Sequence, residues 1–395
     1  MENKLVIGID ATNIRGGGGA THLIELLANL DPEKLNIKKV VLWTGASTSS
    51  LIMNKDWLVK VNPKMLNMGL FFRTIWQIIF LSKSATSFKC DVIYVPGGSF
   101  FGSFKPVVSM SQNLLPFEAS EYKRFGISKT TLRLVMLRFS QSQTFKKSSG
   151  VIFLTEYARK VVENITGELS STIIIPHGVS SKFYKKPKLQ LNFNSRSESN
   201  PIKVLYVSII NQYKHQWNVV DAIAALRKKY NYPIELSLVG PSFPSAKKKL
   251  DLQIDLNDPN HDWINYIGPV DHSGLADYYF DADIGVFASS CENLPIILLE
   301  KMAAGLPIAS SNKGPMPDVL GDSGVYFDPE KSDEIASSIL NLITSHDLRD
   351  SLSSKSFAKS KSYKWDNCSH DTFNFLCNVA KGNKAILLEN EELLK

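Results

Sequence analysis

Short runs of β-branched and other apolar residues alternate with segments of helical periodicity along the whole chain, and no other feature restricts the fold as strongly. The apolar runs are residues 5–9, 40–43, 91–95, 106–110, 150–154, 172–175, 203–207, 234–239, 264–267, 284–287 and 307–309. Strands that are buried on both faces have such uninterrupted apolar sequences. Their alternation with helices predicts parallel sheets that are covered by helices on both sides.

A polar stretch interrupts this alternation near the middle of the chain. Residues 185–201 hold lysine, serine and asparagine between prolines and show no periodicity, which is typical of a linker between domains. A chain of 395 residues also exceeds the size at which a single core stops growing. We therefore expect two Rossmann-like, doubly wound α/β domains, residues 1–184 and 200–362, that face each other across a ligand-binding cleft.

The composition is that of a globular protein without a membrane span. Hydrophobic residues make up 44% and charged residues 21% of the chain, and no window of about 18 residues is apolar and uncharged. The first residues do not read as a signal peptide. We expect a cytoplasmic protein with free thiols at Cys90, Cys291, Cys368 and Cys377, because the cysteines have no paired short spacing. The net charge of +7 favours anionic partners.

Four consecutive glycines, residues 16–19, precede the helical pattern of residues 20–30. Glycine lets a ligand approach the backbone and a helix start attracts anions, so this turn is a candidate phosphate site. The alternative is a flexible turn without a ligand. The spacing is not that of a dinucleotide-binding fingerprint. His22, in the first turn of the helix, faces the cleft in one interpretation and solvent in the other.

Two acidic residues flank a helix start in the second half of the chain. Glu292 comes shortly after a buried strand, and Glu300 lies more than one turn into the helix that Pro295 introduces. Asn293 and Leu294 offer backbone N–H groups at the positive end of this helix, where a phosphate binds. The Glu300 carboxylate suits a vicinal diol such as ribose. The alternative is a solvated helix with two surface acids.

Two further loops follow expected strands. Residues 208–216 come after the first strand of the second domain, and Lys214 in this loop is placed to reach a diphosphate as a point charge. A surface lysine is the alternative. His215 either contacts the ligand or packs and caps the next helix. Residues 174–179, which include His177, form either a turn that lines the cleft or a tight turn without a ligand.

The stretch that begins at Glu292 resembles the family 4 retaining glycosyltransferases (glycosyl transferases group 1), which have the two-domain GT-B fold. Two glutamates separated by seven residues and followed by Lys301-Met-Ala-Ala-Gly-Leu-Pro-Ile carry this resemblance. Residues 175–179, 268–283, 314–329 and 363–365 also resemble the family. The resemblance implies that residues 1–184 bind the acceptor, that residues 200–362 bind a nucleotide sugar, and that residues 363–395 form a helical segment that crosses back to the N-terminal domain.

The resemblance also implies a role for each matching residue. Glu292 contacts the donor sugar beside the reacting carbon and Lys214 neutralises the leaving diphosphate, so these two are the expected catalytic residues. The expected donor contacts are made by Gly18, Gly19, Ser208, Asn211, His215, Val270, Asn293, Leu294 and Glu300. The candidates on the acceptor side are His22, Gln112 and His177.

One departure from the family pattern concerns phosphate neutralisation. The family usually has an arginine a few residues before the lysine and a glycine after it, whereas this chain has Ser208 or Ile209 at the first position and His215 at the second. Neutralisation then depends on Lys214 and the helix dipole, or on another basic residue. We expect no metal ion and no cofactor besides the donor substrate.

The expected reaction is the transfer of a hexosyl group, with retention of configuration, from GDP-mannose, dTDP-rhamnose or a UDP-hexose to a glycan acceptor. A lipid-linked acceptor in surface polysaccharide or O-antigen biosynthesis is the expectation by family association. Three alternatives stay open. These are a non-hydrolysing nucleotide-sugar epimerase, a dinucleotide-dependent oxidoreductase, and a non-catalytic nucleotide- or nucleic-acid-binding protein, although no aromatic platform accompanies the basic residues.

Peripheral association with the inner face of the cytoplasmic membrane is suggested by two segments. Residues 70–81 are predicted to form either an amphipathic helix that docks on a membrane or a helix that faces the core. Residues 129–147 combine basic and apolar side chains in one segment. Together they suggest a basic surface that faces a membrane.

Overall fold

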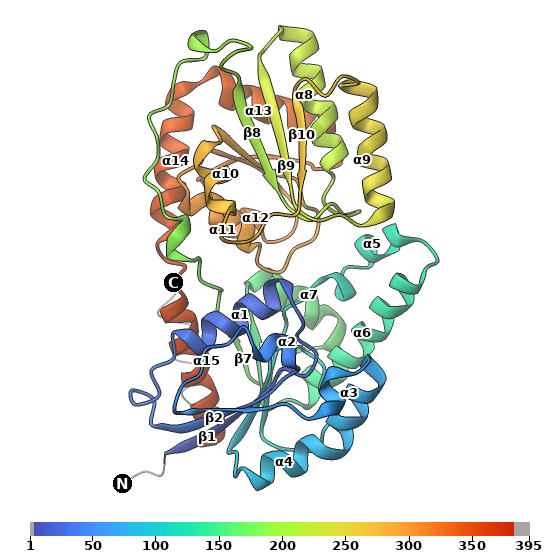
Figure 1. Cartoon of the computed structure of the whole chain (residues 1–395), viewed down its shortest axis with the longest axis vertical. Coiled ribbons are helices and arrows are strands. Elements are labelled where there is room, and N and C mark those ends of the chain that lie inside the picture. The colour runs from blue at the N-terminus through green and yellow to red at the C-terminus, as the bar shows by residue number, and fades with distance from the viewer. Residues whose placement is uncertain (1–3, 383–395) are drawn as a thin grey trace. The chain divides into compact units, whose positions relative to one another are not determined.

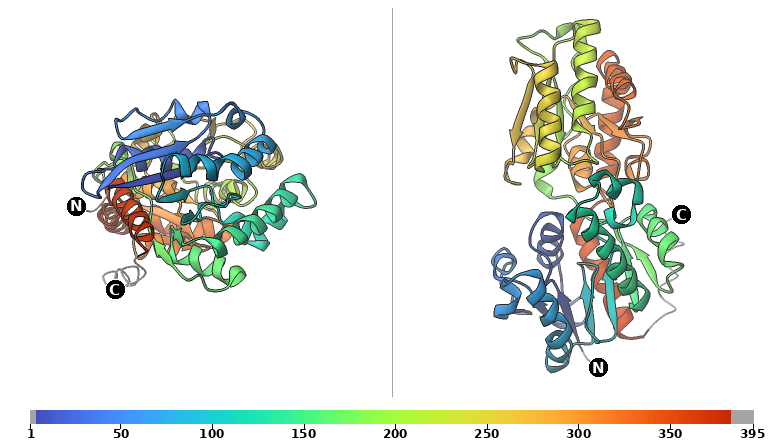
Figure 2. Two further views of the ribbon diagram at one scale, coloured as in Figure 1. Left: turned by 90° about the horizontal axis from the view of Figure 1, so that it is seen from below. Right: turned by 90° about the vertical axis from the view of Figure 1, so that its right-hand side faces the viewer.

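The computed structural model describes residues 4–382, which form two compact units (Figure 1). The first unit takes the described residues up to Tyr122, Ile127–Gly178 and the described residues from Lys364. The second unit takes Lys123–Gly126 and Val179–Tyr363. Helices lie on both faces of each sheet (Figure 1, Figure 2). The doubly wound α/β class that the sequence predicts is therefore confirmed.

Each sheet is parallel throughout and reverses its strand order once. Within the described residues the first sheet has seven strands in the order β3-β2-β1-β4-β5-β6-β7, and the second has six in the order β10-β9-β8-β11-β12-β13. The reversals lie between β1 and β4 in the first unit and between β8 and β11 in the second. In such sheets the ligand binds outside the carboxyl ends of the strands at this point.

The first unit is built from strands and helices that alternate along the chain. Its strands are β1 (Leu5–Asp10), β2 (Ile37–Trp43), β3 (Leu58–Val61), β4 (Val92–Val95), β5 (Val107–Met110), β6 (Gly150–Phe153) and β7 (Thr172–Ile174). Its helices are α1 (Gly17–Ala28), α2 (Ala46–Ser49), α3 (Leu70–Trp76), α4 (Ser82–Ser87), α5 (Ala119–Tyr122), α6 (Lys129–Lys147), α7 (Glu156–Thr166) and α15 (Trp365–Ala380).

The second unit repeats the plan. Its strands are β8 (Ile202–Val207), β9 (Ile234–Val239), β10 (Ile264–Gly268), β11 (Ile284–Phe287), β12 (Ile308–Ser311) and β13 (Val325–Phe327). Its helices are α8 (Gln216–Tyr230), α9 (Pro244–Asn257), α10 (Leu275–Asp281), α11 (Ile296–Ala303), α12 (Met316–Leu320), α13 (Ser332–Thr344) and α14 (His346–Ser360). Helix α8 packs against α9 and α13, and α11 packs against α14.

Two segments differ from the sequence prediction. Helix α1 begins at Gly17, so three of the four glycines lie in its first turn, and Gly16 is its N-cap residue. The predicted helix over residues 70–81 is divided into α3 and a π-helical turn, Gln77–Leu81, in which Gln77 is buried and hydrogen-bonds to Asp10 at the end of β1. The π-helical turn therefore has a structural role, because it accommodates the buried hydrogen bond between Gln77 and Asp10.

The chain passes between the units at both ends of residues 123–126 and again at residues 178–179 and 363–364. Gly178 closes the first unit, and a Cβ atom at this position would collide with the backbone nitrogen of Trp365, the first residue of α15. Val179 N–H donates to Tyr363 O over 3.0 Å in the second unit. Helix α15 packs against α1 and β4, so the end of the described chain belongs to the first unit.

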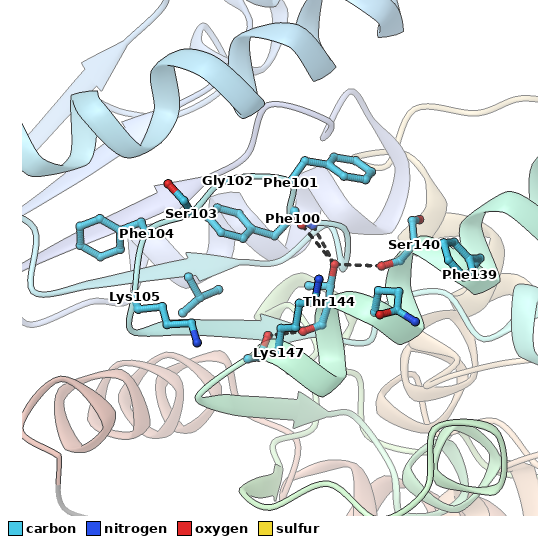
Figure 3. Close-up of a pocket in the computed structure, with 13 residues that line it drawn as sticks. Phe100, Phe101, Gly102, Ser103, Phe104, Lys105, Phe139, Ser140, Thr144 and Lys147 are labelled. Carbon is cyan, nitrogen blue, oxygen red and sulfur yellow. Dashed lines mark hydrogen bonds between the residues drawn. The ribbon is translucent and has the colours of Figure 1, made fainter.

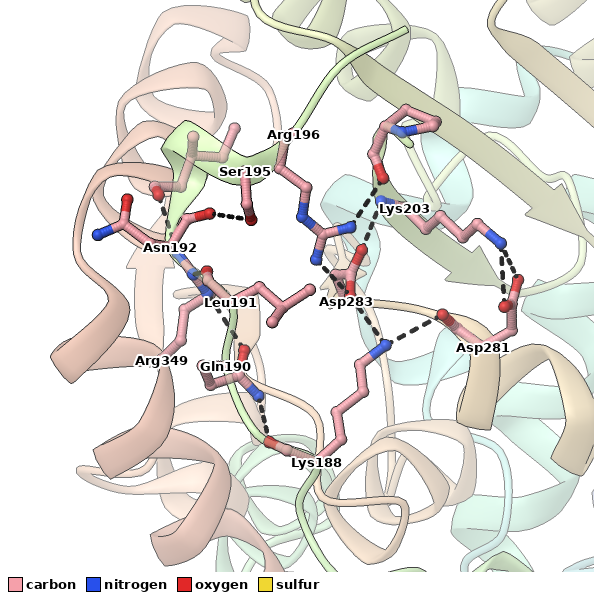
Figure 4. Close-up of polar contacts among 12 residues, drawn as sticks. Lys188, Gln190, Leu191, Asn192, Ser195, Arg196, Lys203, Asp281, Asp283 and Arg349 are labelled. Carbon is pink, nitrogen blue, oxygen red and sulfur yellow. Dashed lines mark hydrogen bonds and ion pairs between the residues drawn. The ribbon is translucent and has the colours of Figure 1, made fainter. Parts of the chain in front are cut away.

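The polar stretch of residues 185–201 is fixed to the second unit (Figure 4). Lys188 and Arg196 both pair with Asp283, at 2.8 and 3.0 Å. Arg349 in α14 donates to the side chain of Gln190 over 3.2 Å. Although burial opposes the ionised form, the two cations and the Lys203 N–H hold the pKa of Asp283 below its usual value. The segment predicted as a linker is thus an ordered strap on its domain.

Candidate functional site

Two loops of the second unit bring an ion pair to the point where its strand order reverses. Lys214 lies in the loop after β8, and Glu292 lies in the loop after β11. The Lys214 ammonium contacts Glu292 Oε1 directly, and the two side chains are 5% and 16% exposed. Sequence reasoning named both residues, and the fold places them together where a doubly wound sheet binds its ligand.

The loop after β8 is held by its own hydrogen bonds. Asn211 Oδ1 accepts from Gln212 N–H at 2.7 Å, and Lys214 N–H donates to Asn211 O at 3.0 Å. His215 has a left-handed backbone with φ of 50° before α8 begins, and its Nε2 lies 3.0 Å from Ser290 Oγ. Ser208, Asn211, Lys214 and His215 are all buried. His215 therefore joins this loop to the loop that carries Glu292.

Glu300 lies on α11 and is 2% exposed. Tyr279 Oη, in α10, donates to Glu300 Oε2 at 2.8 Å, and His272 Nε2 lies 3.1 Å from Glu300 Oε1. A buried carboxylate needs such partners. The alternative of two surface acids on a solvated helix is excluded, because Glu300 is enclosed and Glu292 is paired.

His272 also joins Glu300 to the loop in which a base-binding residue is expected. Val270 is half-buried in this loop, which follows β10, and a Cβ on Gly274 would lie 3.4 Å from its Cγ1. Lys182 Nζ donates to the His272 carbonyl over 2.7 Å. Val270 and Glu300 are thus on elements that contact each other, as a base and its ribose require.

The start of α11 differs slightly from the prediction. Pro295 is the N-cap residue, and the helix begins at Ile296. Asn293 and Leu294, which precede it, are 6% and 7% exposed. Gly314, with φ of 58°, approaches this segment so that an added Cβ would lie 3.8 Å from Glu292 N. The backbone of this loop is enclosed by the turn before α12 (Met316–Leu320).

The candidates in the first unit fall into two groups. Gly18 has open space where a Cβ would project, whereas a Cβ on Gly19 would lie 3.1 Å from Gln112 Oε1. Gly19 and Gln112 therefore form one corner at the carboxyl ends of β1 and β5. His22 and His177 form the other group, and their rings stack with centroids 4.5 Å apart beside Trp365.

The stacked histidines are enclosed. His22 is 0% and His177 4% exposed, and His22 Nε2 lies 3.1 Å from Tyr94 Oη. Burial lowers the pKa of His22 to about 3, and burial together with His22 lowers the pKa of His177 well below its usual value. Both rings are therefore neutral at physiological pH. The interpretation of His22 as a solvent-facing residue is therefore wrong.

Sequence reasoning assigned no role to three further residues, His272, Lys301 and Asp10. His272 lies in a stretch that resembles the family, but its contact with Glu300 had no local signal, because only the fold brings the two residues together. Lys301 follows Glu300 and is fully buried, although lysine is the last residue that a pattern would place in a core. Asp10, the last residue of β1, is 3% exposed, and burial raises the pKa of its carboxyl despite hydrogen bonds from Thr12 and Gln77.

Comparison with solved structures defines the fold class. Sucrose-phosphate synthase from Thermosynechococcus elongatus superposes with a TM-score of 0.73 over 93% of this chain and 97% of that one, at 16% identity. An Anabaena protein crystallised in complex with UDP-glucose gives 0.68 over 96% and 99%, at 19% identity. The chain thus has the two-domain GT-B fold of glycosyltransferases.

Sequence comparison finds a family for part of the chain. Residues 188–359 match the family described as glycosyl transferases group 1, so the chain contains a domain of that family. The O-antigen chain mannosyltransferase B of Escherichia coli is 27% identical over 172 residues, which are 43% of this chain and 44% of that protein. The match spans less than half of the relative's length.

Proposed function

We propose that this protein is a retaining, metal-independent glycosyltransferase that moves a hexosyl group from a nucleoside diphosphate sugar to a glycan acceptor. The observation that carries the proposal is the Lys214–Glu292 pair at the reversal point of the second sheet, with Glu300 enclosed on the adjacent helix. The family match over residues 188–359 supports it. An epimerase or a binding protein would not release nucleotide in an acceptor-dependent way.

The roles follow from charge and position. When the donor binds, its diphosphate replaces Glu292 as the ionic partner of Lys214. The Glu292 carboxylate then orients the sugar hydroxyls beside the reacting carbon. Cleavage of the sugar–phosphate bond leaves positive charge on the sugar and negative charge on the diphosphate, which Lys214 and the α11 N–H groups stabilise. The acceptor hydroxyl attacks from the leaving-group face and gives its proton to the departing phosphate. Glu300 holds the ribose.

The donor is a nucleoside diphosphate hexose. Similar proteins include a mannosyltransferase and a protein crystallised in complex with UDP-glucose, so GDP-mannose, UDP-glucose and dTDP-rhamnose form the panel to test. Release of nucleotide from each donor, measured with and without acceptor glycans, selects among them. Absence of release from every donor would contradict the proposal.

Replacement of Lys214 tests the role of the pair. Lys214→Ala should lower turnover about tenfold to a hundredfold, because a charge-assisted hydrogen bond contributes about 1.5–3 kcal/mol. Lys355→Ala is the matched control, since Lys355 pairs with Asp322 and is half exposed on α14. Unchanged turnover in a folded Lys214→Ala protein would exclude this role, while the control should keep wild-type turnover.

We further propose that the acceptor is lipid-linked and is met at a membrane surface. Helix α6 buries Leu134 and Phe145 on one face and exposes Leu132, Val135, Met136 and Phe139 at helical spacing on another. Leu132 and Met136 are each 63% exposed and Phe139 is 69% exposed. Contiguous apolar surface of this kind marks an interaction site.

The charge around this face suits an anionic membrane. Helix α6 carries five lysines and arginines and no acidic residue. Exposed Phe71, Ile78 and Ile79 lie in α3 and the π-helical turn of the same unit. Each basic residue near an anionic surface adds about 1 kcal/mol. Within residues 4–382, no helix has the length and apolarity to span a bilayer.

A cavity opens beside α6 (Figure 3). Its volume is about 520 Å³, and it lies between the loop after β4 and the second half of α6. Phe100, Phe101, Phe104 and Phe139 supply an apolar lining, while Lys105 and Lys147 supply cations. An apolar recess with basic side chains is suited to part of an anionic lipid.

Vesicle sedimentation tests the membrane face. The protein should bind phosphatidylglycerol vesicles and not phosphatidylcholine vesicles, and Met136→Ser with Phe139→Ser should weaken binding at least tenfold, because burial of each large apolar side chain contributes about 1.5–3 kcal/mol. Leu252→Ser with Leu256→Ser on α9 is the matched control, with residues 71% and 75% exposed. Equal binding by both double variants would contradict the membrane face and leave the donor reaction untouched.

A further inference from the structure

Lys301 is a buried cation beside the Lys214–Glu292 pair. Its side chain is 0% exposed, and its Nζ has no hydrogen-bond partner among the described residues. The stem packs over Gly285 of β11, whose missing Cβ would lie 3.0 Å from Lys301 Cδ. A buried ammonium without an acceptor is costly. An apolar side chain would fill this space without that cost, so Lys301 calls for a functional explanation.

Three aromatic rings surround the ammonium. The Lys301 Nζ lies 5.9, 5.6 and 5.2 Å from the ring centroids of Tyr206, Tyr279 and Phe287. Two of these rings are bonded to residues of the candidate site, because Tyr206 Oη donates to Lys214 O at 2.7 Å and Tyr279 Oη donates to Glu300 Oε2 at 2.8 Å. Ring faces attract a cation without fixing it as an acceptor would.

Lys214 and Lys301 share one of these rings. Lys214 Nζ lies 5.4 Å from the Phe287 centroid, and Lys301 Nζ lies 5.2 Å from it, so the two nitrogens are no more than about 11 Å apart. Charges at this separation inside a protein are screened much less than charges in water. An anion that binds Lys214 therefore acts on Lys301 as well.

The charges that face Lys301 oppose one another. Burial lowers the pKa of Lys301 to about 7, Glu300 and Glu292 favour its charged form, and Lys214 disfavours it. Near neutral pH its protonation therefore responds to any new charge in the site.

We propose that Lys301 supplies a second positive charge to the donor diphosphate from beneath the site, by taking up a proton from solvent when the nucleotide sugar binds. The inference rests on the proposed function. Lys301 does not contact the ligand and acts on the diphosphate only by electrostatic attraction. It is therefore a positioning residue and not a catalytic one. Phosphate neutralisation then no longer depends on Lys214 alone, although Ile209 stands near where the family pattern has arginine.

Calorimetry detects the proton. The donor of the panel that binds best is titrated into the protein at pH 8 in two buffers of different ionisation enthalpy. A nucleotide sugar has both phosphates esterified and no group that titrates at this pH. The wild type should take up a substantial fraction of a proton per donor bound, and its affinity should fall by up to tenfold per pH unit above pH 7. Lys301→Met should take up none and should show no such pH dependence.

Two further variants separate the outcomes. Lys301→Arg keeps a permanent charge, so it should retain affinity without proton uptake. Lys359→Met removes a half-buried lysine from α14 and should keep the wild-type proton count. A wild-type proton count in Lys301→Met, or in Lys301→Arg where the first variant does not fold, would overturn the inference. Failure of the wild type to bind any nucleotide sugar would instead contradict the proposed function.

Discussion

Lys214 and Glu292 are the residues on which the functional account depends. A largely buried ion pair is weak evidence for stability, because desolvation offsets the attraction between its charges. The pair has better evidence as a ligand site, since the two residues come from loops 78 positions apart that converge at the reversal of the sheet. The sequence pattern predicted each residue, whereas their direct contact required the fold.

The burial of Lys301 predicts how the free energy of unfolding depends on pH. Its pKa in the folded protein is about 7 and its usual value is 10.5, so between these values the unfolded chain binds the proton and the folded chain does not. The free energy of unfolding of the wild type should therefore rise with pH across this window, by at most about 1.4 kcal/mol per unit, relative to Lys301→Met.

Below pH 7 the lysine is charged in both states and its burial is unfavourable, so Lys301→Met should be the more stable protein there. Urea unfolding of both proteins at pH 6, 8 and 9.5 measures the difference. Parallel pH profiles for the two proteins would show that Lys301 is ionised in the folded state throughout.

At the scale of elements, α11 organises the second unit. Glu300 and Lys301 are neighbours in the sequence, yet one contacts α10 and the other packs on β11. The helix ends at Ala303, and Gly305 adopts φ of 67° where an added Cβ would lie 2.8 Å from Pro187. The contact of Gly305 with the strap of residues 185–201 had no sequence signal.

The ion pairs of the strap with Asp283 are predicted to stabilise the fold. Asp283→Asn should lower the free energy of unfolding by about 2 kcal/mol at neutral pH, because it leaves Lys188 and Arg196 without their carboxylate. The pKa of Asp283 is lowered in the folded protein, so its contribution is present above about pH 4 and is lost as the pH falls further.

Denaturant titrations of wild type and Asp283→Asn at pH 7 and pH 3 measure this contribution. The difference between the two proteins should shrink at the lower pH. Asp281→Asn is the matched control, because Asp281 pairs with Lys203 and is 65% exposed. If the two variants lost the same stability, the strap would be held by other contacts.

At the scale of the molecule, the alternation of strands and helices was enough to predict two doubly wound domains. Periodicity reports burial on both faces of a strand, and that property fixes the parallel class. The same reasoning placed α1 after its glycines and treated residues 70–81 as one helix. The second difference has a tertiary cause, since Gln77 hydrogen-bonds to Asp10 and the helix becomes π-helical there.

The candidate site was predictable where a motif marks it and not where only the fold assembles it. Glu292, Glu300 and Lys214 stand in recognisable loops after strands. His272, Tyr279 and Lys301 lie in stretches that resemble the family, but their contacts with Glu300 and with the aromatic rings come from packing between elements and had no local signal. The roles of Gly18, Gly19, Gln112, His22 and His177 stay predictions, and the enclosed His22–His177 stack indicates a structural part for both rings.

A crystal structure with a bound nucleotide sugar tests the central claim most directly. The account predicts that a diphosphate oxygen lies within hydrogen-bonding distance of Lys214 Nζ, that sugar hydroxyls contact Glu292, and that the ribose meets Glu300. A nucleotide bound elsewhere, with the contact between Lys214 and Glu292 intact, would contradict it.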